Sequence, residues 1–293
     1  MTAGIALTDH ARPLTWTVDA VNERGETVPT AIAGEEPLTL YLDKRELVTL
    51  MTLGSAPEHL AIGYLRNQRL VSSIDAIAEV QVDWETHAAV VTSRRMRDTG
   101  TPIWDAGDDG RSLDARLQRR TVTTGCGQGT VFGDLMTELE AIRLPEHVRL
   151  TQEVLYDVLD RVRRHESVYK AAGAVHGCAL CSNAGHDRGE ILRFVEDVGR
   201  HNAVDAIAGW MWLEGQSGAD KLFYTTGRLT SEMVIKCAQM GIPFLLSRSG
   251  LTKMGWELAQ RLGMTMIGRC QGRHYLLFTG NHRFVTLPVT GLA

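Results

Sequence analysis

The residue best suited to covalent chemistry is Cys126, which lies in the glycine-rich segment 123–130, TTGCGQGT. Glycine on both sides leaves the backbone open, so a large partner can approach the sulfur. A helix is expected at about residues 131–144, and its free N–H groups would favour the thiolate below the free-cysteine pKa of about 8.5. Cys126 is therefore a candidate nucleophile, and the alternative is an unreactive loop cysteine.

The other four cysteines are weaker candidates. Cys178 and Cys181 form a C-x-x-C pair with His176 upstream, but on a strand they point to opposite faces, which is poor geometry for one metal or one disulfide. The zinc deaminase signature also needs a Glu and a Pro that this segment lacks, so we expect no metal site and keep zinc as the weaker alternative. Cys237, in an apolar helical segment, is typical of a core residue. Cys270 either touches a ligand or is a bystander.

Arginine supplies most of the positive charge, since only five of the 31 basic residues are lysines. The planar guanidinium matches phosphate and carboxylate oxygens, although codon bias alone can produce such an excess. Four arginines follow predicted strands, in turns rich in glycine and hydroxyl residues: Arg200, Arg228, Arg248 and Arg269. Ligands of open α/β sheets bind beyond the carboxyl ends of strands, near helix N-termini. The pattern predicts a basic rim that binds a nucleotide or a pyrophosphate-containing cofactor.

Composition and charge exclude several classes of protein. The net charge of -4 and the lack of an aromatic-interleaved basic stripe argue against nucleic acid as a partner. The chain has no Walker-type G-x-x-x-x-G-K-[ST] motif, so phosphoryl transfer from ATP is unsupported. No apolar run approaches the roughly 18 residues of a membrane span. Residues 1–9 lack the basic start of a secretory signal, so we expect a cytoplasmic protein with reduced thiols.

The sequence suggests three parts: an irregular lead-in (1–37), a smaller N-terminal α+β domain with the Cys126 loop (38–145), and an α/β domain (146–293). In the second part, alternating β-formers predict a strand at 38–42. A helix is expected from Pro57 to about Leu70 with Ser55 as its cap, followed by two strands within 76–91. The polar, Gly-containing stretch 94–120 predicts a long surface segment that leads into Cys126.

The third part begins with a helix capped by Thr151, whose apolar residues recur on one face. Strands are then expected at 177–183, 190–196, 221–226, 243–247, 264–268 and 275–279, with helices at 201–213, 231–240 and 252–262. Strands that alternate with helices of about ten residues indicate an α/β fold with a mainly parallel sheet covered on both faces.

Several segments share the pattern of one known family. They are AGAVH at 172–176, EDVGRHNAVD at 196–205, GRLTSEMVIK at 227–236, GIP at 241–243 and GMTMIG at 263–268, with EEPL at 35–38 and LAIGYL at 60–65 nearer the start. These segments resemble the FdhD/NarQ family, and the resemblance runs from about residue 33 to 279. The acidic EDVGRHN block is its most specific part.

The resemblance implies a cytidine-deaminase-like three-layer sandwich without deaminase chemistry. It also implies a sulfur carrier, of sulfurtransferase type rather than a multiple-turnover enzyme, that formate dehydrogenase needs for activity. Such carriers take persulfide sulfur from a cysteine desulfurase and pass it to the molybdenum or tungsten of bis-molybdopterin guanine dinucleotide. The implied partners are the desulfurase and the catalytic subunit of formate dehydrogenase, GDP or GMP would mimic the cofactor, and a homodimer is left open.

By position, the resemblance places the persulfide on Cys126, although Gly129 replaces the second cysteine of the family's loop. It places cofactor binding on Arg269, Cys270, Gln271, Gly272, Arg273 and His274, to which we add Arg228 and His201 from the rim. Arg269 replaces a usual aromatic residue, which would alter stacking on guanine or add a phosphate contact. His201 would contact phosphate or assist proton movement, or be structural.

Two other functions are compatible with the sequence. A cofactor-binding chaperone would escort the dinucleotide to formate dehydrogenase without transferring sulfur, and the missing second loop cysteine keeps this alternative open. A nucleotide hydrolase or deaminase would require bound zinc and turnover of free nucleotides.

Overall fold

The computed structural model describes residues 4–8, 12–103, 121–122, 129–130, 141–165 and 167–287. The chain forms two compact units, each assembled from separate stretches. The first unit comprises Met1–Leu135, Glu166–Gly177 and Val195–Gln216, and the second comprises Met136–His165, Cys178–Phe194 and Ser217–Ala293. The division of the sequence at residues 37 and 145 remains a prediction.

The first unit is built on a five-stranded sheet in the order β1-β6-β7-β4-β5. Its strands are β1 (Ala6–Leu7), β4 (Glu36–Leu42), β5 (Arg45–Thr52), β6 (Ile77–Asp83) and β7 (Ala88–Ser93). β4 pairs antiparallel with β5 and parallel with β7. Leu38, Leu40 and Leu42 are fully buried along β4, which confirms the alternating strand predicted there.

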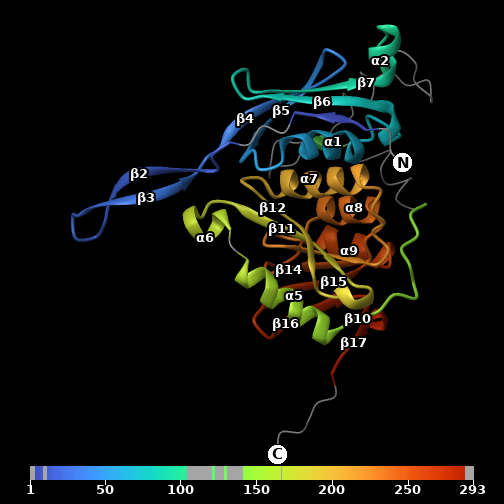
Figure 1. Ribbon diagram of the computed structural model, residues 1–293. Coiled ribbons are helices and arrows are strands. Elements are labelled where there is room, and N and C mark those ends of the chain that lie inside the picture. The colour runs from blue at the N-terminus through green and yellow to red at the C-terminus, as the bar shows by residue number, and fades with distance from the viewer. Residues whose placement is uncertain are drawn as a thin grey trace, which may run out of the picture. The chain divides into compact units, whose positions relative to one another are not determined.

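Helices α1 (Pro57–Asn67) and α7 (Arg200–Leu213) pack against each other in this unit (Figure 1). Their backbones approach so closely that a Cβ added to Gly63 would lie 2.8 Å from the Gly209 nitrogen. The prediction that Ser55 caps α1 is wrong. The N-cap is Ala56 without a side-chain bond, because the Ser55 hydroxyl donates instead to the Glu196 carbonyl at 2.8 Å.

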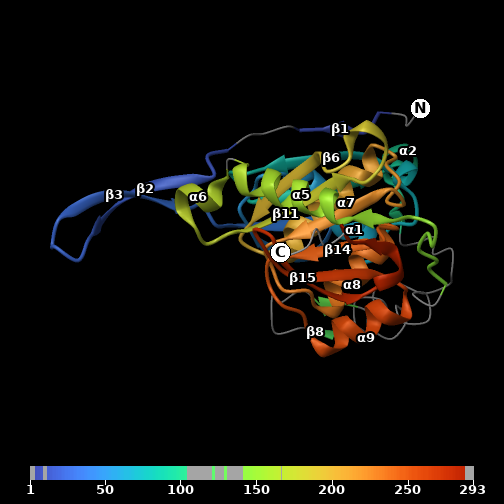
Figure 2. The ribbon, with the colours of Figure 1, turned by 90° about the horizontal axis from the view of Figure 1, so that it is seen from below.

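A β-hairpin occupies much of the expected irregular lead-in, so that prediction is wrong for these residues. β2 (Thr15–Val21) and β3 (Thr27–Ala33) pair antiparallel along their whole length. Valine and threonine favour strands, and the Asn22 side chain accepts bonds from two backbone N–H groups within the turn. Figures 1 and 2 both show the hairpin extending away from the five-stranded sheet of its unit.

The start of the expected surface segment 94–120 is also helical. Helix α2 (Arg94–Thr99) is capped by the Ser93 hydroxyl and ends at Gly100 in the left-handed region. Residues 104–120 lie outside the described residues. β8 (Thr121–Val122) and β9 (Gly129–Thr130) pair antiparallel on either side of the Cys126 segment, and residues 123–128 are themselves outside the description.

The second sheet has six strands in the order β12-β11-β13-β14-β15-β16. They are β11 (His176–Ser182), β12 (Ile191–Asp197), β13 (Lys221–Thr225), β14 (Phe244–Ser247), β15 (Thr265–Gln271) and β16 (His274–Thr279). β13, β14 and β15 are parallel, whereas β11 and β16 run antiparallel to their neighbours β13 and β15. The prediction of a mainly parallel sheet is therefore wrong: the sheet is mixed. Only two residues separate β15 from β16, whereas a parallel crossover needs a dozen or more.

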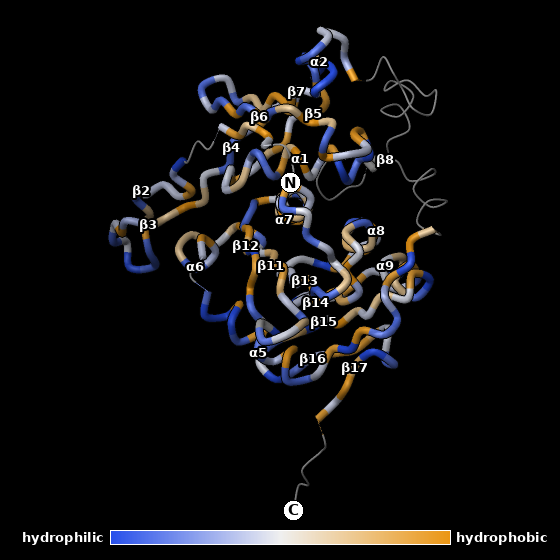
Figure 3. The backbone as a smooth tube through the Cα atoms, turned by 45° about the vertical axis from the view of Figure 1, so that its right-hand side comes forward, coloured by the Kyte–Doolittle hydropathy of each residue, from blue (hydrophilic) through white to orange (hydrophobic). Residues whose placement is uncertain are grey.

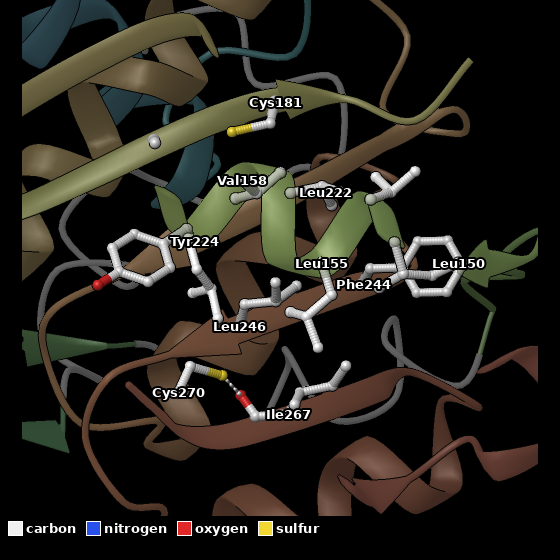
Figure 4. Close-up of a cluster of buried hydrophobic side chains, with 13 residues drawn as sticks. Leu150, Leu155, Val158, Cys181, Leu222, Tyr224, Phe244, Leu246, Ile267 and Cys270 are labelled. Atoms are coloured by element: carbon white, nitrogen blue, oxygen red, sulfur yellow. Dashed lines mark hydrogen bonds between the residues drawn. The ribbon is translucent and has the colours of Figure 1, made fainter. Parts of the chain in front are cut away.

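The core of the second unit lies between this sheet and α5 (Gln152–Arg164), as Figure 4 shows. Leu155 and Val158 of α5 are fully buried with Leu222 and Phe244 of the sheet. The hydroxyl of Thr151 accepts the Val154 N–H, so the predicted cap of this helix is confirmed.

The remaining helices and strands are short or connect the larger ones. They are α8 (Ser231–Gln239), α9 (Lys253–Arg261), α6 (Val168–Ala172), the 3₁₀ turns η1 (Ile74–Ala76), η3 (Gly185–Asp187) and η4 (Asn281–Arg283), and the parallel pair β10 (Leu150–Thr151) and β17 (Phe284–Val285). Among the described helices, none combines the length and the hydrophobicity required to cross a bilayer.

Candidate functional site

The second unit has a set of linked turns at the carboxyl ends of its three parallel strands. Thr225 and Ser247, the last residues of β13 and β14, are fully buried. The Thr225 hydroxyl accepts the Gly227 N–H at 3.0 Å. The Ser247 hydroxyl donates to the Gly227 carbonyl at 2.6 Å and accepts the Ser249 N–H at 2.8 Å. The two hydroxyls therefore fix the first residues of both turns.

Backbone bonds continue this linkage to the third turn. The Leu229 N–H donates to the Gly250 carbonyl at 3.0 Å, and the Arg269 N–H donates to the Ser249 carbonyl at 2.9 Å. The Arg248 N–H donates to the Thr225 carbonyl at 3.2 Å. Because each turn is bonded to the next, the three segments form one rigid edge of the sheet.

This edge presents three guanidinium groups. Arg228, Arg248 and Arg269 are all exposed and follow β13, β14 and the middle of β15. Helices α8 and α9 begin directly after the first two turns, so their free N–H groups add to the positive potential. The buried hydroxyl of Thr230, the N-cap residue of α8, has no hydrogen-bond partner among the described residues. Arginine forks beside helix N-termini suit phosphate oxygens, and phosphate binding at this edge remains a prediction.

Arg269 owes its exposure to an irregularity in β15. The pairing of β15 with β16 shifts register between Gly268 and Gln271, so Arg269 and Cys270 form a bulge. Arg269 has a φ of 57°, a left-handed conformation that costs about 1 kcal/mol for a residue with a Cβ. The bulge directs Arg269 outward and Cys270 into the core, where it is 2 % exposed. Burial raises the pKa of the Cys270 thiol to about 12.

The rest of the predicted cofactor-binding run forms the connection between β15 and β16. Gln271 pairs with His274, and Gly272 makes the turn with a φ of 59°. The Arg273 guanidinium lies 4.4 Å from the centre of the Tyr156 ring of α5 and 4.0 Å from the Asp160 carboxylate. Gln271, Arg273 and His274 are exposed. Cofactor binding by this run remains a prediction.

The four described cysteines are all buried. Cys178, Cys181 and Cys237 are 0 % exposed, and Cys270 is nearly so. Burial raises the pKa of Cys181 to about 12 and that of Cys237 well above its ordinary value. Within the described part of the chain, no three His, Cys, Asp or Glu side chains gather as metal ligands. Cys126 lies outside the described residues, so its role remains a prediction.

In the first unit, the acidic block is organised around Asp197. Its carboxylate accepts hydrogen bonds from the Gly199 N–H at 2.9 Å, the Asn202 amide at 2.8 Å, the Leu53 N–H at 3.1 Å and the Thr52 hydroxyl. Burial raises the pKa of Asp197 to about 6, although each of these four donors lowers it. The network joins the end of β5 to the first turn of α7, so Asp197 is a positioning group rather than an open ligand site.

Glu196 is occupied in a similar way. Its carboxylate accepts the backbone N–H groups of Val168 at 2.6 Å and Tyr169 at 3.1 Å, at the start of α6. The carboxylates of Glu196 and Asp197 thus both accept backbone N–H groups. His201 is 1 % exposed in the first turn of α7, and its contact with a ligand remains a prediction.

The structure therefore links the turns of three arginines of the predicted rim, Arg228, Arg248 and Arg269, and it adds Thr230 to the candidate site. The fourth, Arg200, is 8 % exposed in the first turn of α7, which belongs to the first unit. The orphaned hydroxyl of Thr230 has no counterpart in the sequence pattern, because its burial depends on tertiary packing.

The pattern of these residues is that of a known family. The FdhD/NarQ family model matches residues 33–285, and the chain belongs to this family. The match includes the acidic block, all three arginine turns and the Cys126 segment.

Individual relatives give the same assignment. The sulfur carrier protein FdhD of Listeria monocytogenes is 26% identical over 261 residues, covering 88% of this chain and 93% of that protein. The sulfur carrier protein FdhD of Bacillus subtilis is 27% identical over 267 residues, covering 89% of this chain and 94% of that protein. The fold is similar to the crystal structure of a proposed formate dehydrogenase accessory protein from Desulfotalea psychrophila, with a TM-score of 0.70, 24% identity, and coverage of 93% of this chain and 100% of that one.

Proposed function

We propose that this protein is a sulfur carrier for formate dehydrogenase and that Cys126 carries the sulfur as a persulfide. The observation that carries the proposal is the burial of the other four thiols. Cys178, Cys181, Cys237 and Cys270 are at most 2 % exposed, so none can meet the persulfide of another protein without unfolding. A family whose named relatives are sulfur carriers needs one accessible thiol, and Cys126 is the remaining cysteine.

The loading step is a thiol–persulfide exchange. The Cys126 thiolate attacks the outer sulfur of the desulfurase persulfide, the S–S bond breaks, and the desulfurase cysteine leaves as a thiolate. The product is Cys126–S–SH. Such exchange depends on thiolate character and access rather than on a strong general base, so a single loop cysteine is sufficient and Gly129 does not prevent it.

The acceptor of the sulfur is bis-molybdopterin guanine dinucleotide, which binds as a substrate. Arg228, Arg248 and Arg269 would contact its phosphates, and the Thr230 hydroxyl and the N-terminus of α8 would supply further donors. Cys126 would then supply its outer sulfur to the molybdenum or tungsten of this substrate: the S–S bond would break, Cys126 would return to the thiol, and the metal, in its reduced +4 state, would provide the two electrons that convert the sulfane sulfur to sulfide. Formate dehydrogenase would receive the cofactor. We include in this proposal that the fold is a cytidine-deaminase-like three-layer sandwich. A mixed sheet that contacts both α5 and α9 is compatible with such a fold.

Labelling tests the transfer. A cysteine desulfurase supplied with ³⁵S-cysteine should label the wild-type protein and a Cys270→Ala control, but not Cys126→Ala. Equal labelling of Cys126→Ala would remove this residue from the mechanism. If no form were labelled while GDP still bound, the protein would be a cofactor chaperone.

Nucleotide binding tests the rim separately. Titration calorimetry should show that Arg228→Gln or Arg248→Gln binds GDP with about tenfold lower affinity, since one charge-assisted contact contributes about 1.5 kcal/mol or more. Arg261→Gln, at the far end of α9, is the matched control and should bind as the wild type does. Unchanged binding in both rim variants would place the nucleotide elsewhere.

A further inference from the structure

The connection between β15 and β16 places a charged side chain over an aromatic ring of α5. The central carbon of the Arg273 guanidinium lies 4.4 Å from the centre of the Tyr156 ring. At this separation the planar cation is attracted by the electrons of the ring. Figure 3 shows α5 beside β16, the strand that begins directly after Arg273. We call these two side chains, Tyr156 and Arg273, the platform.

Hydrogen bonds fix the ring of the platform. The Tyr156 hydroxyl donates to the Arg273 carbonyl at 3.2 Å and accepts the Gln152 amide at 2.7 Å. The Tyr275 ring lies edge-on to Tyr156, with the two ring centres 6.2 Å apart. Because these contacts hold the ring in one orientation, a ligand that uses the platform does not have to order it, and less entropy is lost on binding.

The guanidinium of the platform is accessible from the solvent. The Arg273 side chain is 71 % exposed, although it covers the Tyr156 ring. Arginine stacks on planar aromatic groups, so the face of the guanidinium that is turned away from Tyr156 can take a second planar group. Nucleobases stack on aromatic and guanidinium planes of this kind. The platform therefore suits a nucleobase.

A carboxylate lies at the edge of the platform. Asp160 is one helical turn after Tyr156, on the same face of α5. Its Oδ2 atom lies 4.0 Å from the Arg273 guanidinium, which is beyond hydrogen-bond distance. Its Oδ1 atom accepts a bond of 3.3 Å from Arg163. Since each carboxylate oxygen has two lone pairs, Asp160 can accept further N–H groups beside the platform.

Among the common nucleobases, guanine matches such an acceptor. Only guanine carries two adjacent donors on its Watson–Crick edge, the N1–H and the N2 amino group, and a carboxylate can accept both. Adenine has an unprotonated N1 at the same place, and its lone pair is repelled by a carboxylate. Stacking alone does not distinguish the two purines, because every base has a planar face. Discrimination between them therefore depends on Asp160.

We propose that Tyr156, Asp160 and Arg273 form a guanine subsite, in which the base stacks on Arg273 and its N1–H and N2 amino group donate to Asp160. This inference rests on the proposed function, in which the arginines of the rim hold the phosphates of the same nucleotide. It assigns the reading of the base to α5, a helix outside the rim.

The course of β15 brings the rim and the subsite into one binding surface. Leu246 of β14 lies opposite Ile267 of β15, so Arg269 is level with the turn that follows β14. Arg273 comes four residues later, in the connection that continues β15. A guanine nucleotide whose phosphates lie at Arg269 thus follows the chain toward the platform with its base.

Paired nucleotides test the role of Asp160. Inosine diphosphate lacks only the N2 amino group of GDP, so calorimetry should show that the wild type binds GDP about tenfold more tightly, the effect of one charge-assisted hydrogen bond. Asp160→Ala should bind the two nucleotides equally. Asp157→Ala is the matched control, because its carboxylate accepts a bond of 2.8 Å from Arg161 instead, and it should keep the preference. A wild type without the preference, or Asp160→Ala with it, would overturn the subsite.

Arg273→Lys tests the platform, because lysine keeps the charge but has no planar face to stack on. GDP and inosine diphosphate should both bind about tenfold more weakly, the loss expected for one stacked base. Inorganic pyrophosphate, which has no base, should bind as it does to the wild type. Unchanged binding of GDP to Arg273→Lys would show that this residue acts through its charge alone and would refute stacking.

Failure of the subsite and failure of the proposed function give different results. If Arg228→Gln weakens the binding of GDP while Asp160→Ala keeps the preference over inosine diphosphate, the rim stands and the guanine subsite is refuted. If the wild type binds neither GDP nor pyrophosphate, the nucleotide site of the proposed function is refuted and the subsite with it.

Discussion

The Asp197→Asn variant tests whether burial or hydrogen bonding dominates the electrostatics of the acidic block. Asp197 is 3 % exposed, and all four of its partners donate to it. Burial nevertheless raises the pKa of Asp197 from 3.8 to about 6. A shift of about two pH units corresponds to roughly 3 kcal/mol.

The sign follows from proton binding. Between about pH 4 and 6 the folded protein holds the Asp197 proton more tightly than the unfolded chain does. This contribution to the free energy of unfolding is therefore complete below about pH 4 and is lost as the pH rises through 6. Asparagine has no such titration. The free energy of unfolding of the wild type, minus that of Asp197→Asn, should fall by up to about 3 kcal/mol between pH 4 and pH 7.

Urea denaturation followed by tryptophan fluorescence at a series of pH values measures this difference. Asp98→Asn is the control, because the hydrogen bond from Arg97 lowers the pKa of Asp98 and gives the opposite sign. If the advantage of the wild type over Asp197→Asn instead grows as the pH rises, the four donors outweigh burial and the reasoning is refuted.

Gly63→Ala should lower the free energy of unfolding by at least about 2 kcal/mol in the same urea titration, because the added Cβ would overlap the α7 backbone. Gly250→Ala is the control and should be nearly neutral, because the atom nearest to its added Cβ lies 3.8 Å away. Glu196→Gln should lower the free energy of unfolding by about 1 kcal/mol and speed hydrogen exchange of the Val168 and Tyr169 amides at the start of α6. Unchanged exchange would contradict the capping role of Glu196. Iodoacetamide should modify one thiol of the native wild type quickly and none of Cys126→Ser, and a second fast thiol would show that a described cysteine is accessible.

Local signals predicted many of the elements. Thr151 was recognised as a helix cap because capping requires only a hydroxyl and an N–H three residues later. The alternation of strands and helices from residue 221 onward predicted the parallel strands β13, β14 and β15, because β13 and β14 are each followed by enough chain for a crossover to the next strand. The hairpin at residues 15–33 was missed, although Thr15–Val21 alternates polar and apolar side chains as a strand does.

The family and the positive edge of the sheet were readable from the sequence alone, because motif residues and the arginines after each strand are local features of the chain. Tertiary structure decided what those features contact. It buried four of the five thiols, bonded Glu196 and Asp197 to backbone donors, and turned Arg273 toward Tyr156 while a bulge directed Arg269 outward. These outcomes depend on contacts between residues far apart in the chain, and no local spacing encodes them.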